Sequence, residues 1–221
     1  MFQVESYMQE LIDALMNCFG NRLVYVGLQG SYMRGEATER SDIDPMIVIE
    51  RLKIDDFDQY KQIIHCLPEP EKSCGFICGK EELANWNPLE ICHLLHATKD
   101  LYGSLTDLVP PYTSDDVRNF AKLSVNNLYH EICHRYLHTN PEKNFAKIAG
   151  SFKNVFFILQ NTHYLDTGVF ATTKAELMEL VTGQDKKILA TSVQLCKGAS
   201  FKFDTLFALL YEWCKSMLLR L

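Results

Sequence analysis

Residues 27–50 read G-L-Q-G-S-Y-M-R-G-E-A-T-E-R-S-D-I-D-P-M-I-V-I-E, and this stretch decides the fold. Its beginning and end belong to apolar runs, whereas its middle is polar and charged. This pattern predicts a strand at 22–28, a loop or short helical turn at 32–37, and a second strand at 43–49. Pro45 lacks an N–H, so its position in the second strand predicts that this side of the strand faces a sheet edge or an open site.

Two aspartates open the second strand. Side chains alternate along a strand, so Asp42 and Asp44 are expected to point to the same face. Two neighbouring carboxylates repel each other, and a divalent cation between them removes that cost. Because Mg²⁺ prefers carboxylate oxygens and shares its shell with water and substrate phosphates, the pair predicts a Mg²⁺ site.

The first strand runs into Gly30 and Ser31. A glycine after a strand lets the backbone approach a ligand closely. A serine at the beginning of the next helical turn offers a hydroxyl and backbone N–H groups to an anion. Phosphate groups on this side and a metal ion beside the aspartates would together form a nucleoside-triphosphate site.

In combination these motifs resemble the signature of the polymerase-β-like nucleotidyltransferase superfamily. Within it, the chain is most similar to the small bacterial and the aminoglycoside-modifying members. The resemblance covers about a tenth of the chain and rests on three motifs: Gly30-Ser31, Arg34-Gly35 and Ser41-Asp42-Ile43-Asp44.

The resemblance also implies a role for each matching residue. It assigns Mg²⁺ binding and catalysis to Asp42 and Asp44. It assigns nucleotide binding to Gly30, Ser31, Arg34 and Ser41. Arg34 would pair with a phosphate or an aspartate, or hold a turn, and Ser41 would fix the loop or bond to a phosphate.

The predicted third strand, 72–79, departs from the pattern of the superfamily. There, a third carboxylate on the strand after the aspartate pair usually completes the metal site and acts as the base. Here one face offers Ser73, Gly75 and Ile77, and the other offers Cys74, Phe76 and Cys78. Three explanations stay open: the carboxylate comes from Glu71, Glu81 or Glu131, two carboxylates suffice with slower chemistry, or nucleotide binds without turnover.

The remaining elements predict two domains. Strands alternating with helices, expected at 4–19, 57–66, 81–86 and 88–101, predict a small N-terminal α/β (α+β) nucleotidyltransferase sheet with flanking helices over residues 1–112. A Pro-rich linker at 110–114 ends it. Residues 113–221 predict a C-terminal helical bundle. Its helices are expected at 117–137, 144–159, 184–196 and 201–221, and a short helix is expected to follow the capping box that begins at Thr173.

Charge is unevenly divided between these halves. Residues 1–112 hold 9 Lys and Arg against 18 Asp and Glu, a net charge of −9, and residues 113–221 hold 13 against 10, a net charge of +3. A triphosphate needs cations that the acidic half scarcely provides. Lys147 and Lys153 are candidates from the bundle, and their spacing lets only one reach the site. Lys153 is favoured, because Phe152 and Phe156 would hold its helix in place as bundle core.

Composition limits the other classes of function. With 47% hydrophobic and 23% charged residues, the 221-residue chain is typical of a soluble globular protein, and its apolar runs are too short for a membrane span. Eight cysteines without a C-x-x-C motif favour reduced thiols and a cytoplasmic location. Nothing is basic enough for a large nucleic-acid footprint. His130, His134 and His138 share one helix face, which we interpret as a polar face rather than a metal site.

The sequence therefore predicts a Mg²⁺-dependent transferase that moves a nucleoside monophosphate from a nucleoside triphosphate to a hydroxyl of a small, antibiotic-like molecule. A protein side chain is the alternative acceptor. A nucleotide-binding regulator without catalysis is the alternative from another class, since the third carboxylate is missing. Pairing of the bundle with a second chain, as in a homodimer, is a further expectation.

Overall fold

The structure of the chain is a computed structural model that describes residues 2–138 and 140–221, with the side chains of 141–144 and 146 left out. It consists of two compact units, Met1–Pro111 and Tyr112–Leu221. Each unit has its own hydrophobic core and is described by itself.

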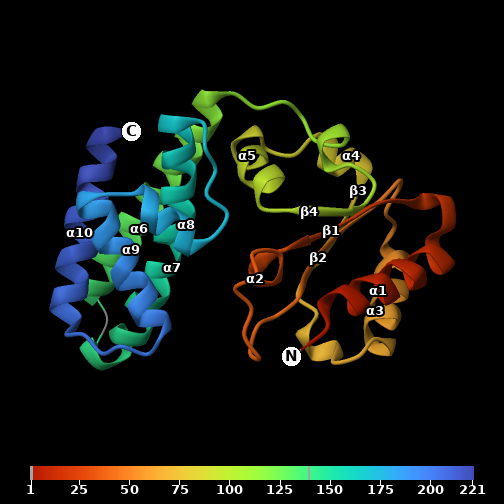
Figure 1. Cartoon of the computed structure of the whole chain (residues 1–221), viewed down its shortest axis with the longest axis horizontal. Coiled ribbons are helices and arrows are strands. Elements are labelled where there is room, and N and C mark those ends of the chain that lie inside the picture. Colours follow the sequence, from red (N-terminus) through yellow and green to blue (C-terminus); the bar gives the residue numbers. More distant parts are fainter. Residues whose placement is uncertain (1, 139) are drawn as a thin grey trace. The chain divides into compact units, whose positions relative to one another are not determined.

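A mixed four-stranded sheet forms the centre of the first unit (Figure 1). Its strands are β1 Leu23–Gln29, β2 Asp44–Ile49, β3 Phe76–Gly79 and β4 Lys99–Tyr102. Their order in the sheet is β3-β2-β1-β4. β1 runs antiparallel to both β2 and β4, whereas β2 and β3 run parallel to each other. The two strands predicted around the opening stretch are thus central and hydrogen-bonded to each other.

Helices cover both faces of this sheet. They are α1 Val4–Phe19, α2 Gly30–Met33, α3 Ile54–Cys66, α4 Lys80–Ala84 and α5 Pro88–His96, with short 3-10 turns at Gly20–Arg22, Pro70–Lys72 and Leu105–Asp107. Figure 1 shows α1 and α3 on one side of the strands and α4 and α5 on the other. Because side chains alternate along β2, Ile47 and Ile49 pack with the first pair of helices, whereas Met46 and Val48 pack with the second.

The expectation of a helix over 88–101 is wrong for its last residues. α5 ends at His96, and the chain then forms β4, in which Lys99 pairs with Leu28 of β1. The edge of β1 that does not pair with β2 decides the conformation of this segment. Without β4, the backbone N–H and C=O groups on that edge of β1 would have no partner from another strand.

Pro45 does not lie on a sheet edge, because β2 is an inner strand. The backbone N–H and C=O of Ile43 bond toward the β3 side, so alternation turns Pro45 to the same side. A Cβ at Gly75 would collide with the carbonyl and ring of Pro45. The continuous ladder between the two strands accordingly begins only at Met46, beyond the proline.

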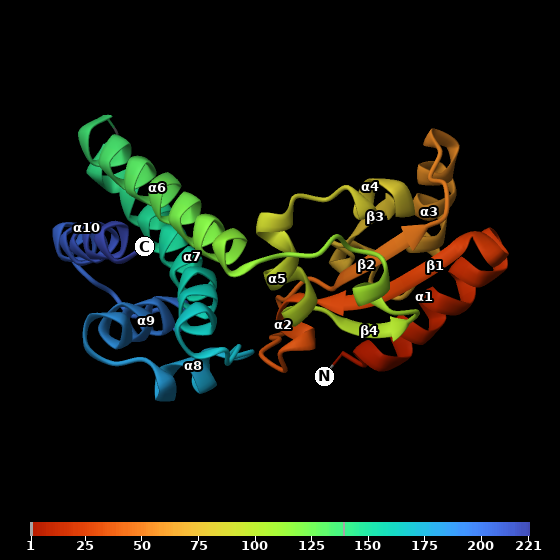
Figure 2. The ribbon, with the colours of Figure 1, turned by 90° about the horizontal axis from the view of Figure 1, so that it is seen from above.

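The second unit is a helical bundle, as predicted (Figure 2). Its helices are α6 Ser114–His138, α7 Pro141–Thr167, α8 Lys174–Leu180, α9 Gly183–Cys196 and α10 Phe203–Arg220. Phe152 and Phe156 are buried in its core together with Trp213, which confirms their predicted packing role. The capping box at Thr173 and Glu176 opens α8. Among the described residues of the whole chain, no helix is long and apolar enough to span a membrane.

Candidate functional site

The Gly-Ser motif and the aspartate pair meet at one end of the β1–β2 hairpin. Gln29, the last residue of β1, pairs with Asp44, the first residue of β2. Gly30 follows with a φ of +68° and begins α2. A Cβ added to Gly30 would collide with the Oδ2 atom of Asp44. Both the backbone conformation and the contact with this carboxylate therefore require glycine.

The charge of Asp42 acts on the carboxylate of Asp44. Asp42 is exposed just before β2, whereas Asp44 is partly buried beside Gly30. Burial raises the pKa of Asp44, the charge of Asp42 raises it further, and the charge of Arg34 opposes both effects. Asp44 shares its face of β2 with Met46, and Asp42 precedes it by two residues. A cation at this position would relieve the repulsion within the pair.

Arg34 lies beside the pair, largely buried. Its Nε donates to the Glu36 carboxylate at 3.1 Å, and the two side chains are only 13% and 22% exposed. The charge of Arg34 also opposes the rise in the pKa of Asp44, so the guanidinium acts on this carboxylate as well as on that of Glu36. Glu36 was not among the sequence-based candidates, although the sequence Arg-Gly-Glu at 34–36 could have indicated such a pair.

The two serines occupy different parts of the loop between the strands. Ser31 stands in the single turn of α2, where its carbonyl accepts a hydrogen bond from the N–H of Glu36 at 2.9 Å. The Ser41 hydroxyl accepts a hydrogen bond from the N–H of Thr38 at 2.8 Å. Ser41 thus fixes the loop, one of its two expected roles, and its contact with phosphate stays a prediction.

The position opposite Asp44 on the neighbouring strand is a cysteine. Ile43 bridges to Ser73, and Met46 pairs with Phe76 in the parallel ladder. The same register sets Cys74 across from Asp44. Phe76 and Met46 belong to one core cluster, so alternation turns Cys74 to the face of Asp44. Cys74 is a free, exposed thiol at the place where a third carboxylate of β3 would face the pair.

The three proposed substitutes for that carboxylate differ in their surroundings. Glu71 is exposed in the 3-10 turn that precedes Ser73, at the same end of the sheet as Asp44. Glu81 lies beyond the far end of β3. That end, where Gly79 pairs with Ile49, is five residue steps, or roughly 16 Å, along the strands from Asp44. Glu131 belongs to the bundle, where it pairs with Arg135 at 2.7 Å and accepts a hydrogen bond from Ser151 at 2.8 Å. The sheet geometry therefore favours Glu71 over Glu81.

The side chains at the hairpin end fit a Mg²⁺ ion that retains other ligands. Nowhere in the described residues do three His, Cys, Asp or Glu side chains form a group that could hold a metal. Asp42 and Asp44 would supply two carboxylates, and the missing Cβ of Gly30 lets the Asp44 carboxylate lie directly against the backbone of the Gly-Ser motif. Mg²⁺ commonly binds through one or two carboxylates, with water and substrate phosphates completing its shell.

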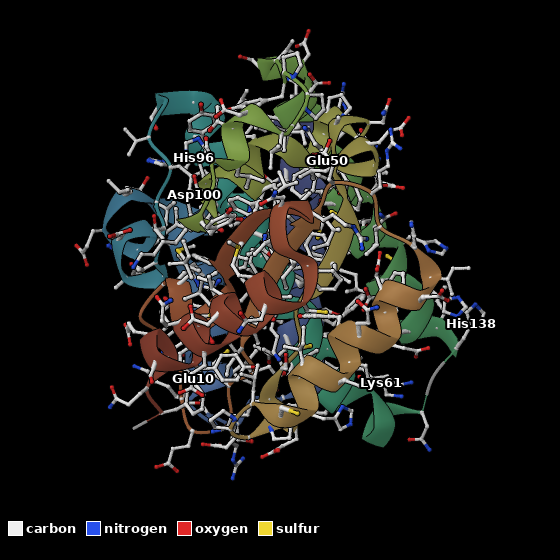
Figure 3. The ribbon with its side chains drawn as sticks, turned by 90° about the vertical axis from the view of Figure 1, so that its right-hand side faces the viewer. Glu10, Glu50, Lys61, His96, Asp100 and His138 are labelled. Atoms are coloured by element: carbon white, nitrogen blue, oxygen red, sulfur yellow. The ribbon has the colours of Figure 1, made fainter. Side chains whose placement is uncertain are left out.

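Besides Glu36, the sequence analysis missed a second residue near the site. His93 lies on α5, and its pKa is lowered to about 4 by burial, by the charge of Arg34 and by His96. The end of α5 is anchored at the hairpin, because Gln29 donates a hydrogen bond to the Thr98 hydroxyl at 2.8 Å. Figure 3 shows His96 on this part of the chain. Only the tertiary structure brings His93 and Arg34 together.

The predicted cations of the bundle lie on α7. Lys147 and Lys153 are both exposed, and they are six residues apart on that helix. Phe152, next to Lys153, is fully buried in the bundle core. A contact of Lys153 with a triphosphate stays a prediction.

Comparisons with known proteins identify the fold. No family model and no curated protein sequence matches the chain. Among solved structures, the chain is similar to spectinomycin adenyltransferase AAD(9) from Enterococcus faecialis, solved with ATP and spectinomycin. The TM-score is 0.60 and the identity 15%, and the match covers 97% of this chain and 98% of that one. The chain therefore shares its fold, along nearly its whole length, with a nucleotidyltransferase.

Proposed function

We propose that this protein is a Mg²⁺-dependent nucleotidyltransferase that transfers a nucleoside monophosphate from a nucleoside triphosphate to a hydroxyl of a small, antibiotic-like molecule. The observation that carries the proposal is the contact of Gly30 with the Asp44 carboxylate. This contact places the backbone of the Gly-Ser motif directly beside a carboxylate whose pKa is raised by burial and by the charge of Asp42. The shared fold with an adenyltransferase that binds ATP and spectinomycin supports it.

Each residue would bind a charged group of the nucleotide or the metal ion that accompanies it. Gly30 and Ser31 would bind the β- and γ-phosphates through backbone N–H groups and the Ser31 hydroxyl. Asp42 and Asp44 would hold Mg²⁺, which when bound supplies neutralisation of the α-phosphate and of the leaving pyrophosphate. Arg34, whose Nε is held by Glu36, would add the charge of its guanidinium to the same phosphates. Catalysis would consist mainly of positioning and electrostatic stabilisation.

Calorimetry tests the binding part of this proposal. Wild-type protein should bind ATP or GTP when Mg²⁺ is present and much more weakly when it is absent. The comparison of the two nucleotides also identifies the preferred one. Failure to bind any nucleotide under either condition would contradict the proposed function.

The acceptor is tested by product analysis. When spectinomycin or a related antibiotic is incubated with the protein, ATP and Mg²⁺, pyrophosphate should be released from ATP and the AMP group should be added to a hydroxyl of the antibiotic, which gains the corresponding mass. Transfer of labelled AMP to a protein band instead would favour the protein AMP-transferase alternative. Binding with no pyrophosphate release from either kind of acceptor would favour the regulator.

The alternative of a nucleotide-binding regulator without catalysis is supported by Cys74, because a thiol occupies the position at which a third carboxylate would face the aspartate pair. The variant Cys74→Glu restores a carboxylate on that face of β3, and Cys74→Gln is its uncharged control of equal size. A gain in pyrophosphate release for Cys74→Glu alone would show that the wild-type site is limited by the missing carboxylate. Equal rates for both variants would show that it is not.

A further inference from the structure

A row of histidines lines the last part of α6. His130, His134 and His138 follow one another at intervals of four residues, so they lie on one face of the helix, one turn apart. All three are exposed, and His138 projects outward from the end of the helix (Figure 3). The row therefore consists of two overlapping pairs that share His134.

The two pairs differ in geometry. The ring centroids of His134 and His138 are 4.9 Å apart, with an angle of 47° between the ring planes. The rings of His130 and His134 are 6.1 Å apart and closer to parallel, at 28°. A metal ion bound to two imidazoles lies about 2.0–2.1 Å from each nitrogen, so the rings must approach closely and converge. The pair of His134 and His138 meets this condition better than the pair of His130 and His134.

The chemistry of the pair selects the ion. Two histidines at positions i and i+4 of a helix are the arrangement by which zinc-binding helices hold their metal. Imidazole nitrogens favour zinc, nickel and copper over Mg²⁺, which prefers oxygen ligands. His138 is also the last residue of α6, where the helix dipole favours a bound cation.

The sequence alone favoured a polar face for these histidines, but from the geometry of their rings we propose that His134 and His138 form a binding site for a divalent transition-metal ion at the end of α6. Because no three ligating side chains converge in the described part of the chain, two histidines would hold the ion and water would complete its shell. The site shares no residue with the aspartate pair, and it does not depend on nucleotidyl transfer. Its occupation would bridge two turns of the helix and stabilise them.

Nickel titration of the full-length, untagged protein tests this site, with His130→Gln, His134→Gln and His138→Gln as variants. Loss of either ligand should raise the Ni²⁺ Kd at least about tenfold, since even indirect partners of metal ligands change affinity by roughly 10–100-fold. His130→Gln should bind nearly like wild type. The same cysteines remain in every variant, so any nickel bound by thiols is common to all of them.

Thermal unfolding supplies the control for folding. All three side chains are exposed, so the variants should unfold at the wild-type temperature without metal. Excess Ni²⁺ should then raise the unfolding temperature of wild type and of His130→Gln, but not of His134→Gln. Nickel binding that survives His134→Gln, or that is lost equally in His130→Gln and His138→Gln, would overturn the assignment.

Discussion

Gly30 and Gly35 have the same backbone conformation but different surroundings. Their φ angles are +68° and +67°, yet a Cβ at Gly30 would collide with Asp44, whereas a Cβ at Gly35 would meet no atom within 4 Å. Gly35→Ala should therefore cost only the backbone strain of about 1–2 kcal/mol in the free energy of unfolding. Gly30→Ala should cost more and should also displace the Asp44 carboxylate.

Urea denaturation and nucleotide calorimetry check this pair of variants. The proposed site predicts that Mg²⁺-dependent nucleotide binding is weakened by Gly30→Ala and little changed by Gly35→Ala. Equal effects of both substitutions on binding would mean that the contact between Gly30 and Asp44 has no part in the site.

Asp42 and Asp44 repel each other when no metal is present. The pKa of Asp44 is raised, chiefly by burial and then by Asp42, so its ionised form is disfavoured in the folded state. The contribution of Asp44 to the free energy of unfolding is full below the pKa that this side chain has in the unfolded chain. It is lost as the pH rises through the higher pKa that Asp44 has in the folded protein. The double variant Asp42→Asn, Asp44→Asn should therefore be as stable as wild type, or more stable, at neutral pH without metal.

The same double variant should lose Mg²⁺-dependent nucleotide binding. Thermal unfolding without metal and calorimetry with Mg²⁺-ATP together separate the two roles. A large drop in unfolding temperature would identify the carboxylates as structural, and retained binding would remove them from the metal site.

At the scale of elements, the beginning of α3 depends on one buried carboxylate. Asp56 is 3% exposed, accepts a hydrogen bond from the N–H of Lys53 at 2.7 Å, and binds both terminal nitrogens of Arg22. Arg22 also donates to the carbonyl of Arg51 at 2.9 Å. The carboxylate thus joins the first turn of α3 to the segments that flank β1 and β2.

Asp56→Ala should lower the free energy of unfolding by about 1.5–3 kcal/mol, the range for hydrogen bonds to charged groups. Asp55→Ala, at an exposed position one residue earlier, is the matched control and should have little effect. Arg22 lowers the pKa of Asp56, so the stability that this carboxylate adds is present above its unfolded pKa and lost as the pH falls through its folded pKa. Urea denaturation at neutral and acidic pH should show the difference between Asp56→Ala and wild type shrinking in acid.

At the scale of the whole molecule, charge separates the two halves of the sequence. Residues 1–112 carry a net charge of −9 and residues 113–221 a net charge of +3. A triphosphate bound with its metal remains negative, so a cation from the helical half would favour it. Lys153 is exposed on α7, and its neighbour Phe152 holds the helix in the bundle core.

Lys153→Ala should weaken binding of the triphosphate by about 1–2 kcal/mol, as expected for loss of a charge-assisted contact, and should leave binding of the nucleoside unchanged. Calorimetry with ATP and adenosine measures both. Lys147→Ala serves as the comparison, since its position on the helix turns it to a different side. Unchanged affinity for ATP in both variants would mean that the bundle adds no cation from this helix.

The sequence by itself determined the part of the protein whose contacts are local. Gly30, Ser31, Asp42 and Asp44 lie within one hairpin, so their meeting follows from two apolar runs and the loop between them. The bundle could be predicted for a similar reason, because apolar periodicity, a capping box and the Pro-rich linker act over only a few residues. These signals fixed the fold class, and the residue types at the hairpin end indicated the chemistry.

Only the tertiary structure decided the contacts between distant segments. The open edge of β1 turned residues 99–102 into a strand, the parallel register of β2 and β3 set Cys74 opposite Asp44, and the anchoring of α5 brought His93 near Arg34. Each outcome depends on which strand edge or sheet face is available in the folded protein. Local sequence cannot encode that choice, because hydrogen-bond pairing and burial are satisfied by partners 30 or more residues away along the chain.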